Sequence, residues 1–186
     1  MNIMVVGVGG QGTLLTSRII GKTALAGGYD VKLSEVHGMA QRGGSVVTFV
    51  RFGDKVFEPV CEEGTVDVLI AFERLEALRY AHFLKKDGVM IVNDTRIDPM
   101  TVVIGAAQYP ENILQGLEKS HKLYTINGGE VAKALGNSKV LNTVVLGLAA
   151  KHIGFEKEEW IRVLQSTVPQ KTVEINTKAF EEGYNS

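Results

Sequence analysis

The sequence contains very little cysteine: Cys61 is the only one among 186 residues. A single thiol cannot close an internal disulfide, and it cannot supply the four thiolates that an iron–sulfur cluster normally needs. We therefore expect Cys61 to be a reduced, partly buried thiol. We also expect that this chain alone holds no such cluster.

The sequence also lacks an excess of charge of either sign. Twenty Lys and Arg residues face 21 Asp and Glu residues, which leaves a formal net charge of −1. No block of like charge occurs, so the basic surface typical of proteins that bind nucleic acids or anionic membranes is missing. We expect neither nucleic acid nor a membrane among the partners.

Long hydrophobic runs and a basic leader are absent as well. The chain opens with Met1-Asn2-Ile3 and passes directly into a glycine loop, with no stretch of about 18 unbroken apolar residues. We therefore expect a cytoplasmic protein. With 45% hydrophobic residues over this length, we expect residues 1–186 to form a single domain.

The N-terminal third of the sequence has the pattern of a βαβ unit. Residues 2–6 are an apolar run, and after the glycines apolar residues recur on one helical face up to Ala24. Gly27 and Gly28 end this helix, and residues 29–36 alternate as a second strand. The crossover between the strands should be right-handed.

The remaining pattern predicts an α/β, Rossmann-like fold, with a mostly parallel sheet flanked by helices, an inserted β-hairpin and a helical C-terminal region at about 139–186. Residues 37–44 are expected to form a loop, and 95–109 a strand followed by a loop. The other predicted strands are 45–52 with a hairpin return at 55–57, 67–72, 88–93 and 122–126. The predicted helices are 74–84, 130–135, 140–153, 156–165 and a last short one.

The glycine loop is the first candidate binding site. Its sequence, GVGGQG, fits G-x-G-x-x-G between a strand and a helix, where the backbone can approach a phosphate at the helix N-terminus. The alternative is that these glycines only let the strand and helix pack closely. The candidate cofactor-binding residues are Gly7, Gly9, Gly10, Gln11, Gly12 and Thr13.

Glu35 lies near the end of the second strand, where a dinucleotide-binding fold places the acid that holds a ribose hydroxyl. Acids are also common at strand ends because solvent begins there. The segment that follows, HGMAQRGGS, is polar and rich in glycine, whereas a dinucleotide-binding protein normally continues into a helix. A stand-alone NAD- or nucleotide-binding protein is therefore the alternative hypothesis, and a scaffold that has lost its ligand is a third.

Two linked motifs carry a family resemblance. GVGGQG at residues 7–12 and SEVHGMAQRGGSV at residues 34–46 resemble the gamma subunit or domain of pyruvate:ferredoxin oxidoreductases, and especially the beta subunit of indolepyruvate:ferredoxin oxidoreductases. The resemblance continues through VRFGDKV, DVLIAFERLEALRY and GVMIVND, and covers most of the chain.

The resemblance implies a small subunit that supports the CoA-dependent oxidative decarboxylation of a 2-oxoacid to an acyl-CoA, with ferredoxin as the electron acceptor. It implies thiamine diphosphate with Mg²⁺ and iron–sulfur clusters on a large partner subunit. The residues agree, since no Gly-Asp-Gly with a downstream Asn occurs and Asp54 and Asp87 are interpreted as turn residues. We expect no cofactor on this chain alone, no catalytic residue and no metal site.

The second loop is expected to face the partner or CoA through Glu35, His37, Gln41, Arg42 and Ser45. Arg42 could bind a CoA phosphate or a carboxylate of the large subunit, with Gln41 and Ser45 orienting the contact. His37 could act as an acid or base, or could brace the bend through its hydrogen bonds. The remaining charged and aromatic residues are expected to be structural: Glu73, Arg74, Glu76 and Arg79 on a solvated helix face, and Trp160 in the core.

Overall fold

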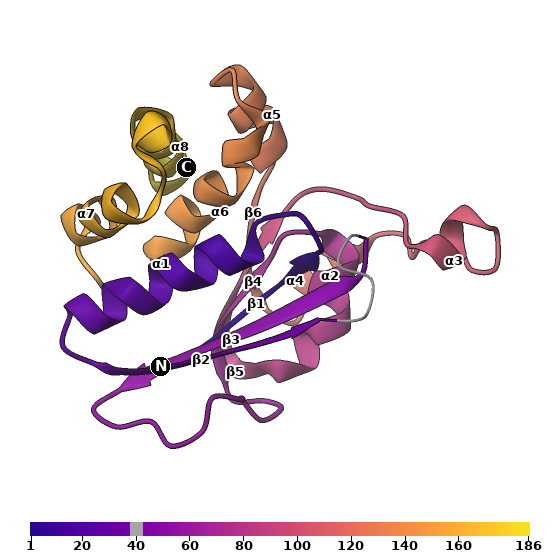
Figure 1. The fold of residues 1–186 in the computed structure, drawn as a ribbon. Helices are drawn as coiled ribbons and strands as arrows, with labels where there is room; N and C mark the ends of the chain where they lie inside the picture. The colour runs from indigo at the N-terminus through magenta and orange to yellow at the C-terminus, as the bar shows by residue number, and fades with distance from the viewer. Residues whose placement is uncertain (38–42) are drawn as a thin grey trace.

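A computed structural model describes residues 1–37 and 43–186, which form a six-stranded sheet with helices on both faces (Figure 1). The sheet order is β2-β3-β1-β4-β5-β6. The strands are β1 (Asn2–Val8), β2 (Asp30–His37), β3 (Ser45–Gly53), β4 (Val66–Ala71), β5 (Leu84–Asn93) and β6 (Lys122–Ile126). Neighbours are parallel from β1 to β6, whereas β3 is antiparallel to both β1 and β2. The predicted α/β, Rossmann-like class is confirmed.

The first helix and the helices after β6 follow the prediction, whereas two short helices between β5 and β6 were not predicted. The helices are α1 (Thr13–Ala26), α2 (Arg74–Tyr80), α3 (Met100–Val103), α4 (Ile113–Glu118), α5 (Gly128–Ala134), α6 (Leu141–Ala150), α7 (Lys157–Thr167) and α8 (Val173–Asn185), with 3-10 turns at Ala81–Phe83, Ser138–Val140 and Gln170–Thr172. The last helix, predicted to be short, has 13 residues. Across the described ranges, none of these helices has both the length and the apolar character needed to cross a membrane.

The hairpin lies elsewhere than predicted. Residues 55–57 form no strand, and β3 instead pairs with β2 along its length. β3 buries side chains on both faces, so it occupies an interior place between β2 and β1. The chain after β3 is held by side chains rather than by a ladder: Arg51 Nη1 donates to the carbonyl oxygens of Glu58 and Val60, at 3.0 and 2.8 Å.

Three smaller predictions between β4 and β6 are wrong. Residues 95–109 contain the short helix α3 and no strand, and α4 was missed because six residues are too few for a helical period to show. The helix predicted to reach Leu84 ends at Tyr80. Asp87, predicted to lie in a turn, lies within β5 because that strand begins at Leu84.

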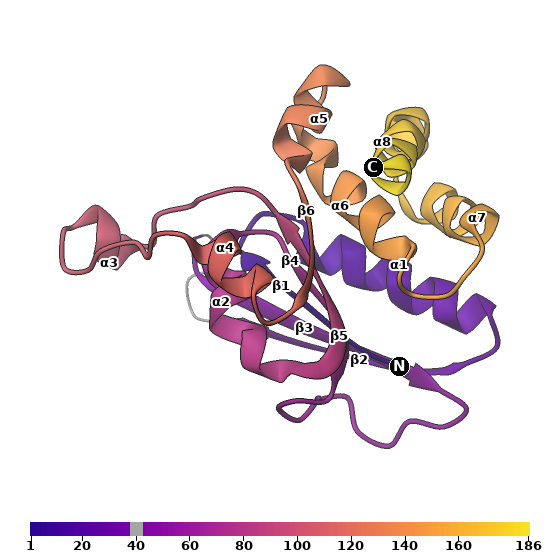
Figure 2. The ribbon, with the colours of Figure 1, turned by 180° about the vertical axis from the view of Figure 1, so that it is seen from behind.

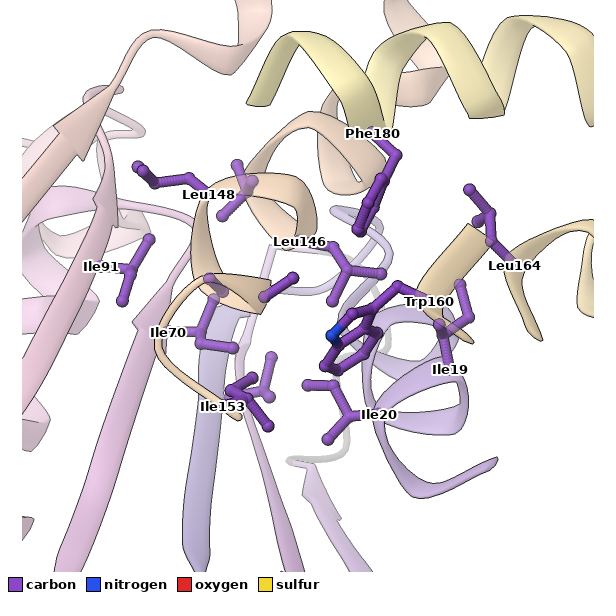
Figure 3. Packing of buried hydrophobic residues seen from close by; sticks show 14 of the residues in the cluster. Ile19, Ile20, Ile70, Ile91, Leu146, Leu148, Ile153, Trp160, Leu164 and Phe180 are labelled. Atoms are coloured by element: carbon purple, nitrogen blue, oxygen red, sulfur yellow. The ribbon is translucent and has the colours of Figure 1, made fainter. Parts of the chain in front are cut away.

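The core has two layers, one on each face of the sheet. Alternate residues of β1 divide between them: Ile3 and Val5 face the layer with α1 and α5–α8, whereas Met4 and Val6 face the layer with α2 and α4. Trp160 is fully buried among side chains of α1, α6 and α8, which confirms its predicted place in the core (Figure 3). Cys61 is buried in the second layer, and burial raises the pKa of its thiol.

Candidate functional site

The glycine loop joins β1 to α1 at the carboxyl edge of the parallel strands. Gly10 and Gly12 have φ angles of +101° and +86°, in the left-handed region that favours glycine. A Cβ at Gly12 would lie 2.8 Å from Asn142 Nδ2, and one at Gly7 would lie 3.0 Å from Gln11 Oε1. The left-handed φ and the contact with Asn142 both favour glycine at position 12, whereas a Cβ at Gly7 would make its neighbours shift by a few tenths of an ångström. A Cβ at Gly10 would meet nothing within 4 Å, so the backbone is open to a ligand there.

Side-chain amides bridge the ends of the central strands. Gln11 Oε1 accepts from the Val8 N–H at 2.7 Å, and Gln11 Nε2 donates to the Phe72 carbonyl at 2.9 Å. Asn93 Nδ2 donates to the same carbonyl at 3.1 Å. In open α/β sheets, ligands bind where the chain leaves neighbouring strands toward opposite faces, and here that point lies between β1 and β4. The Gln11 side chain occupies it and braces the loop.

A cleft of about 380 Å³ opens beside the glycine loop, lined by Gly9, Gly10, Gly12, Thr13, Leu14, Glu35 and Val46. Helix α1 begins at this cleft with Gly12 as its N-cap residue. No side chain caps it, and its first turn contains no acidic residue. The helix N-terminus therefore presents N–H groups and a partial positive charge to the cleft, which favours a bound anion.

Glu35 reaches this cleft from β2, where it pairs with Thr48 of β3. In the usual dinucleotide-binding order, the strand that carries the ribose-binding acid lies next to the first strand. Here β3 lies between β2 and β1, so the acid is one strand further from the glycine loop. The two strands of the predicted βαβ unit are therefore not neighbours in the sheet. The structure still brings Glu35 and the glycine loop to one cleft.

Ser45 opens β3 and is held on the face opposite the cleft. Ser45 Oγ donates to Glu76 Oε2 at 2.5 Å and lies 3.2 Å from Tyr80 Oη. Gly9 N donates to the Gly44 carbonyl at 2.8 Å, which ties the glycine loop to the end of the second loop. The next side chain, Val46, lines the cleft, as alternation along a strand requires.

Two predicted site residues, Gln41 and Arg42, lie outside the described residues, together with Gly38, Met39 and Ala40. The backbone of His37 ends β2, whereas its side chain also lies outside the description.

Two buried carboxylates, Glu73 and Glu76, lie at this edge of the sheet. Their spacing in the sequence had predicted a solvated helix face for both. Glu73 and Glu76 are 1% and 3% exposed. Arg79 does pair with Glu76 at 3.0 Å, as the i, i+3 spacing predicts. Burial raises the pKa of Glu76, while the contacts with Ser45 and Arg79 act in the opposite direction. The sequence carried one signal for them: both follow shortly after the buried strand β4.

The sequence matches the family of pyruvate ferredoxin/flavodoxin oxidoreductases over residues 2–186. It is 44% identical to the indolepyruvate oxidoreductase subunit IorB of Archaeoglobus fulgidus, covering 100% of this chain and 94% of that protein. It is 28% identical to the pyruvate synthase subunit PorC of Methanocaldococcus jannaschii, over 96% of this chain and 92% of that protein. Among solved structures, the gamma subunit of a keto/oxoacid ferredoxin oxidoreductase from Geobacter sulfurreducens superposes with a TM-score of 0.72 at 27% identity, over 99% of this chain and 96% of that one.

Proposed function

Because the chain belongs to the pyruvate ferredoxin/flavodoxin oxidoreductase family, we propose that it is the small subunit of an indolepyruvate-type 2-oxoacid:ferredoxin oxidoreductase. One observation favours the indolepyruvate type over the pyruvate type. The chain is 44% identical to an indolepyruvate oxidoreductase subunit and 28% identical to a pyruvate synthase subunit. We place the complex in the cytoplasm and treat residues 1–186 as one domain of it.

In the proposed reaction, a 2-oxoacid, CoA and two oxidised ferredoxins give an acyl-CoA, CO₂, two reduced ferredoxins and a proton. When bound to the large partner subunit, thiamine diphosphate with Mg²⁺ and the iron–sulfur clusters supply carbanion stabilisation and one-electron transfer. The residues of this chain do not fit those groups. It has one cysteine, and its described part contains no group of three or more His, Cys, Asp or Glu residues able to hold a metal.

The proposed contribution of this chain is therefore binding and assembly. The cleft at the glycine loop combines an uncapped helix N-terminus with an open backbone at Gly10, an arrangement suited to phosphate groups. We assign to it the phosphates of CoA. The predicted roles of His37, Gln41 and Arg42 in the second loop, toward CoA or toward the large subunit, remain part of this proposal.

The assignment of the cofactors to the large subunit can be tested on the purified chain and on the purified complex. The chain expressed alone is expected to be colourless and inactive, and the complex purified through a tag on it is expected to contain thiamine diphosphate, iron and acid-labile sulfide. Cofactor analysis, native mass and arylpyruvate-dependent ferredoxin reduction measure this. Iron–sulfur absorbance or stoichiometric thiamine diphosphate on the isolated chain would contradict the proposal. So would a complex that reduces no ferredoxin with any 2-oxoacid.

The ligand of the cleft can be tested by placing an acid at the helix N-terminus. Leu14 lines the cleft and is 36% exposed, so Leu14→Asp should leave the fold intact. It should weaken CoA binding by the complex about tenfold, because the carboxylate repels phosphate. Calorimetry measures this, with Leu25→Asp, at an exposed position near the other end of α1, as the control. Unchanged affinity of the variant complex for CoA would show that CoA does not bind in this cleft. Tighter binding of NAD than of CoA by the isolated chain would favour the nucleotide-binding alternative.

A further inference from the structure

An arm, residues 97–109, leaves the body of the protein between β5 and α4. Figures 1 and 2 show it from opposite sides, and in both views its helix α3 projects away from the sheet and the other helices. The arm follows the carboxyl end of β5. Because β1, β4 and β5 are parallel, it starts from the same edge of the sheet as the glycine loop.

A buried carboxylate clamps the base of the arm. Glu73 Oε1 accepts from the Ile97 N–H at 3.1 Å and from Tyr109 Oη at 2.5 Å, so it joins the two ends of the arm. Glu73 is 1% exposed. The Arg96 guanidinium lies 4.3 Å from the centroid of the Tyr109 ring, which adds a cation–π contact at the base. The direction of the arm is therefore set by the body of the protein.

The tip of the arm is folded upon itself. The Thr101 carbonyl accepts from the N–H groups of Ala106 and Ala107, at 2.8 and 3.0 Å, and Gly105 has the positive φ of +74° that this reversal needs. Such internal bonds hold the tip in one conformation. A partner that binds it does not have to order it first, which lowers the entropic cost of binding.

The surface of the tip is apolar and uncharged. Met100, Val103 and Ile104 are 70%, 65% and 68% exposed. Residues 99–109, PMTVVIGAAQY, contain no charged side chain. An apolar projection of this kind loses contact with water only if another molecule receives it.

We infer that the tip of the arm docks into an apolar pocket of the large partner subunit, an inference that rests on the proposed function. A second copy of this chain is the other conceivable receiver. Five clefts on the described surface are each lined by at least one charged side chain, so none of them matches an uncharged, apolar tip. The arm also leaves the edge of the sheet that carries the proposed CoA cleft, the edge at which the proposed function places the large subunit.

The test measures the affinity between the two subunits, separated from the purified complex and recombined. Val103→Asp with Ile104→Asp places two charges on exposed positions and should not disturb the core. We expect it to weaken the affinity about 100-fold, as loss of a central apolar anchor does. The matched control is Phe57→Asp, at another exposed apolar position, 79% accessible, in the loop beyond the far end of β3. It should change the affinity less than about threefold.

A photoreactive benzoylphenylalanine at Val103 then identifies the receiver. Cross-linking to the large subunit, mapped by mass spectrometry to apolar residues, supports the inference. Cross-linking to a second copy of this chain overturns it, and so does wild-type affinity of the double variant. If the wild-type chain binds no thiamine diphosphate subunit at all, the proposed function fails. If it binds one with its affinity unaffected by the double variant, only the docking inference fails.

Discussion

Gly183→Ala is expected to lower the free energy of unfolding by about 3 kcal/mol or more. Gly183 lies in α8, and a Cβ there would be 1.8 Å from the Val144 carbonyl oxygen of α6. Backbone atoms cannot yield as the end of a side chain can, so the two helices would have to separate. Gly147 of α6 faces the same crossing, where its Cβ would lie 2.1 Å from the Phe180 carbonyl oxygen.

Separation of α6 and α8 would disturb the larger core layer. Phe180 and Trp160 are both fully buried, and their ring centroids lie 6.5 Å apart in the region shown in Figure 3. Denaturant titration measures the loss. The control is Gly116→Ala in α4, where a Cβ meets nothing within 4 Å. We expect this variant to raise the free energy of unfolding by about 0.5–1 kcal/mol, because alanine has the higher helix propensity. A Gly183→Ala variant as stable as the wild type would mean that the helices do not cross so closely.

Glu73→Ala is expected to lower the free energy of unfolding by about 3 kcal/mol. Besides Ile97 and Tyr109, Glu73 holds the N-terminus of α2, because its Oε2 accepts from the Glu76 N–H at 3.0 Å. Removal of the carboxylate leaves three donors without their acceptor. Burial and the hydrogen bond to Glu73 raise the pKa of Tyr109, so its hydroxyl remains protonated and needs a partner.

The stability of Glu73→Ala is measured by denaturant titration, and the mobility of the arm by hydrogen exchange at residues 97–109, which should become faster. Glu174→Ala is the control, because the Glu174 side chain is 84% exposed and pairs with Lys178 across one helical turn. It should cost less than about 0.5 kcal/mol. Equal stability losses in the two variants, or unchanged exchange in the arm, would show that Glu73 is not the clamp described above.

The local patterns of the sequence predicted the elements well where they are long and regular. Alternation and helical spacing identified β1, α1 and β2, and the glycines at 27 and 28 ended the helix as expected. The linked motifs at 7–12 and 34–46 led to the family that the comparisons show. These signals depend on neighbours in the chain, so one sequence suffices to read them.

The candidate site was predicted in part. The glycine loop and Glu35 do line one cleft, although β3 lies between their strands. The burial of Glu73 and Glu76 was not predicted, because a helical spacing of charges is the same on a solvated face and on a buried one.

The sequence by itself determined the fold class, the first strand–helix–strand unit, the helices after β6, and the family, since each depends on residue type and short spacing. Only the tertiary structure decided which strand lies next to β1, what Glu73 binds and where the arm points. Those depend on contacts between residues far apart in the chain: Glu73 meets Ile97 and Tyr109 across 24 and 36 positions. The free energy of such contacts arises only when the whole sheet has formed, and no local pattern records it.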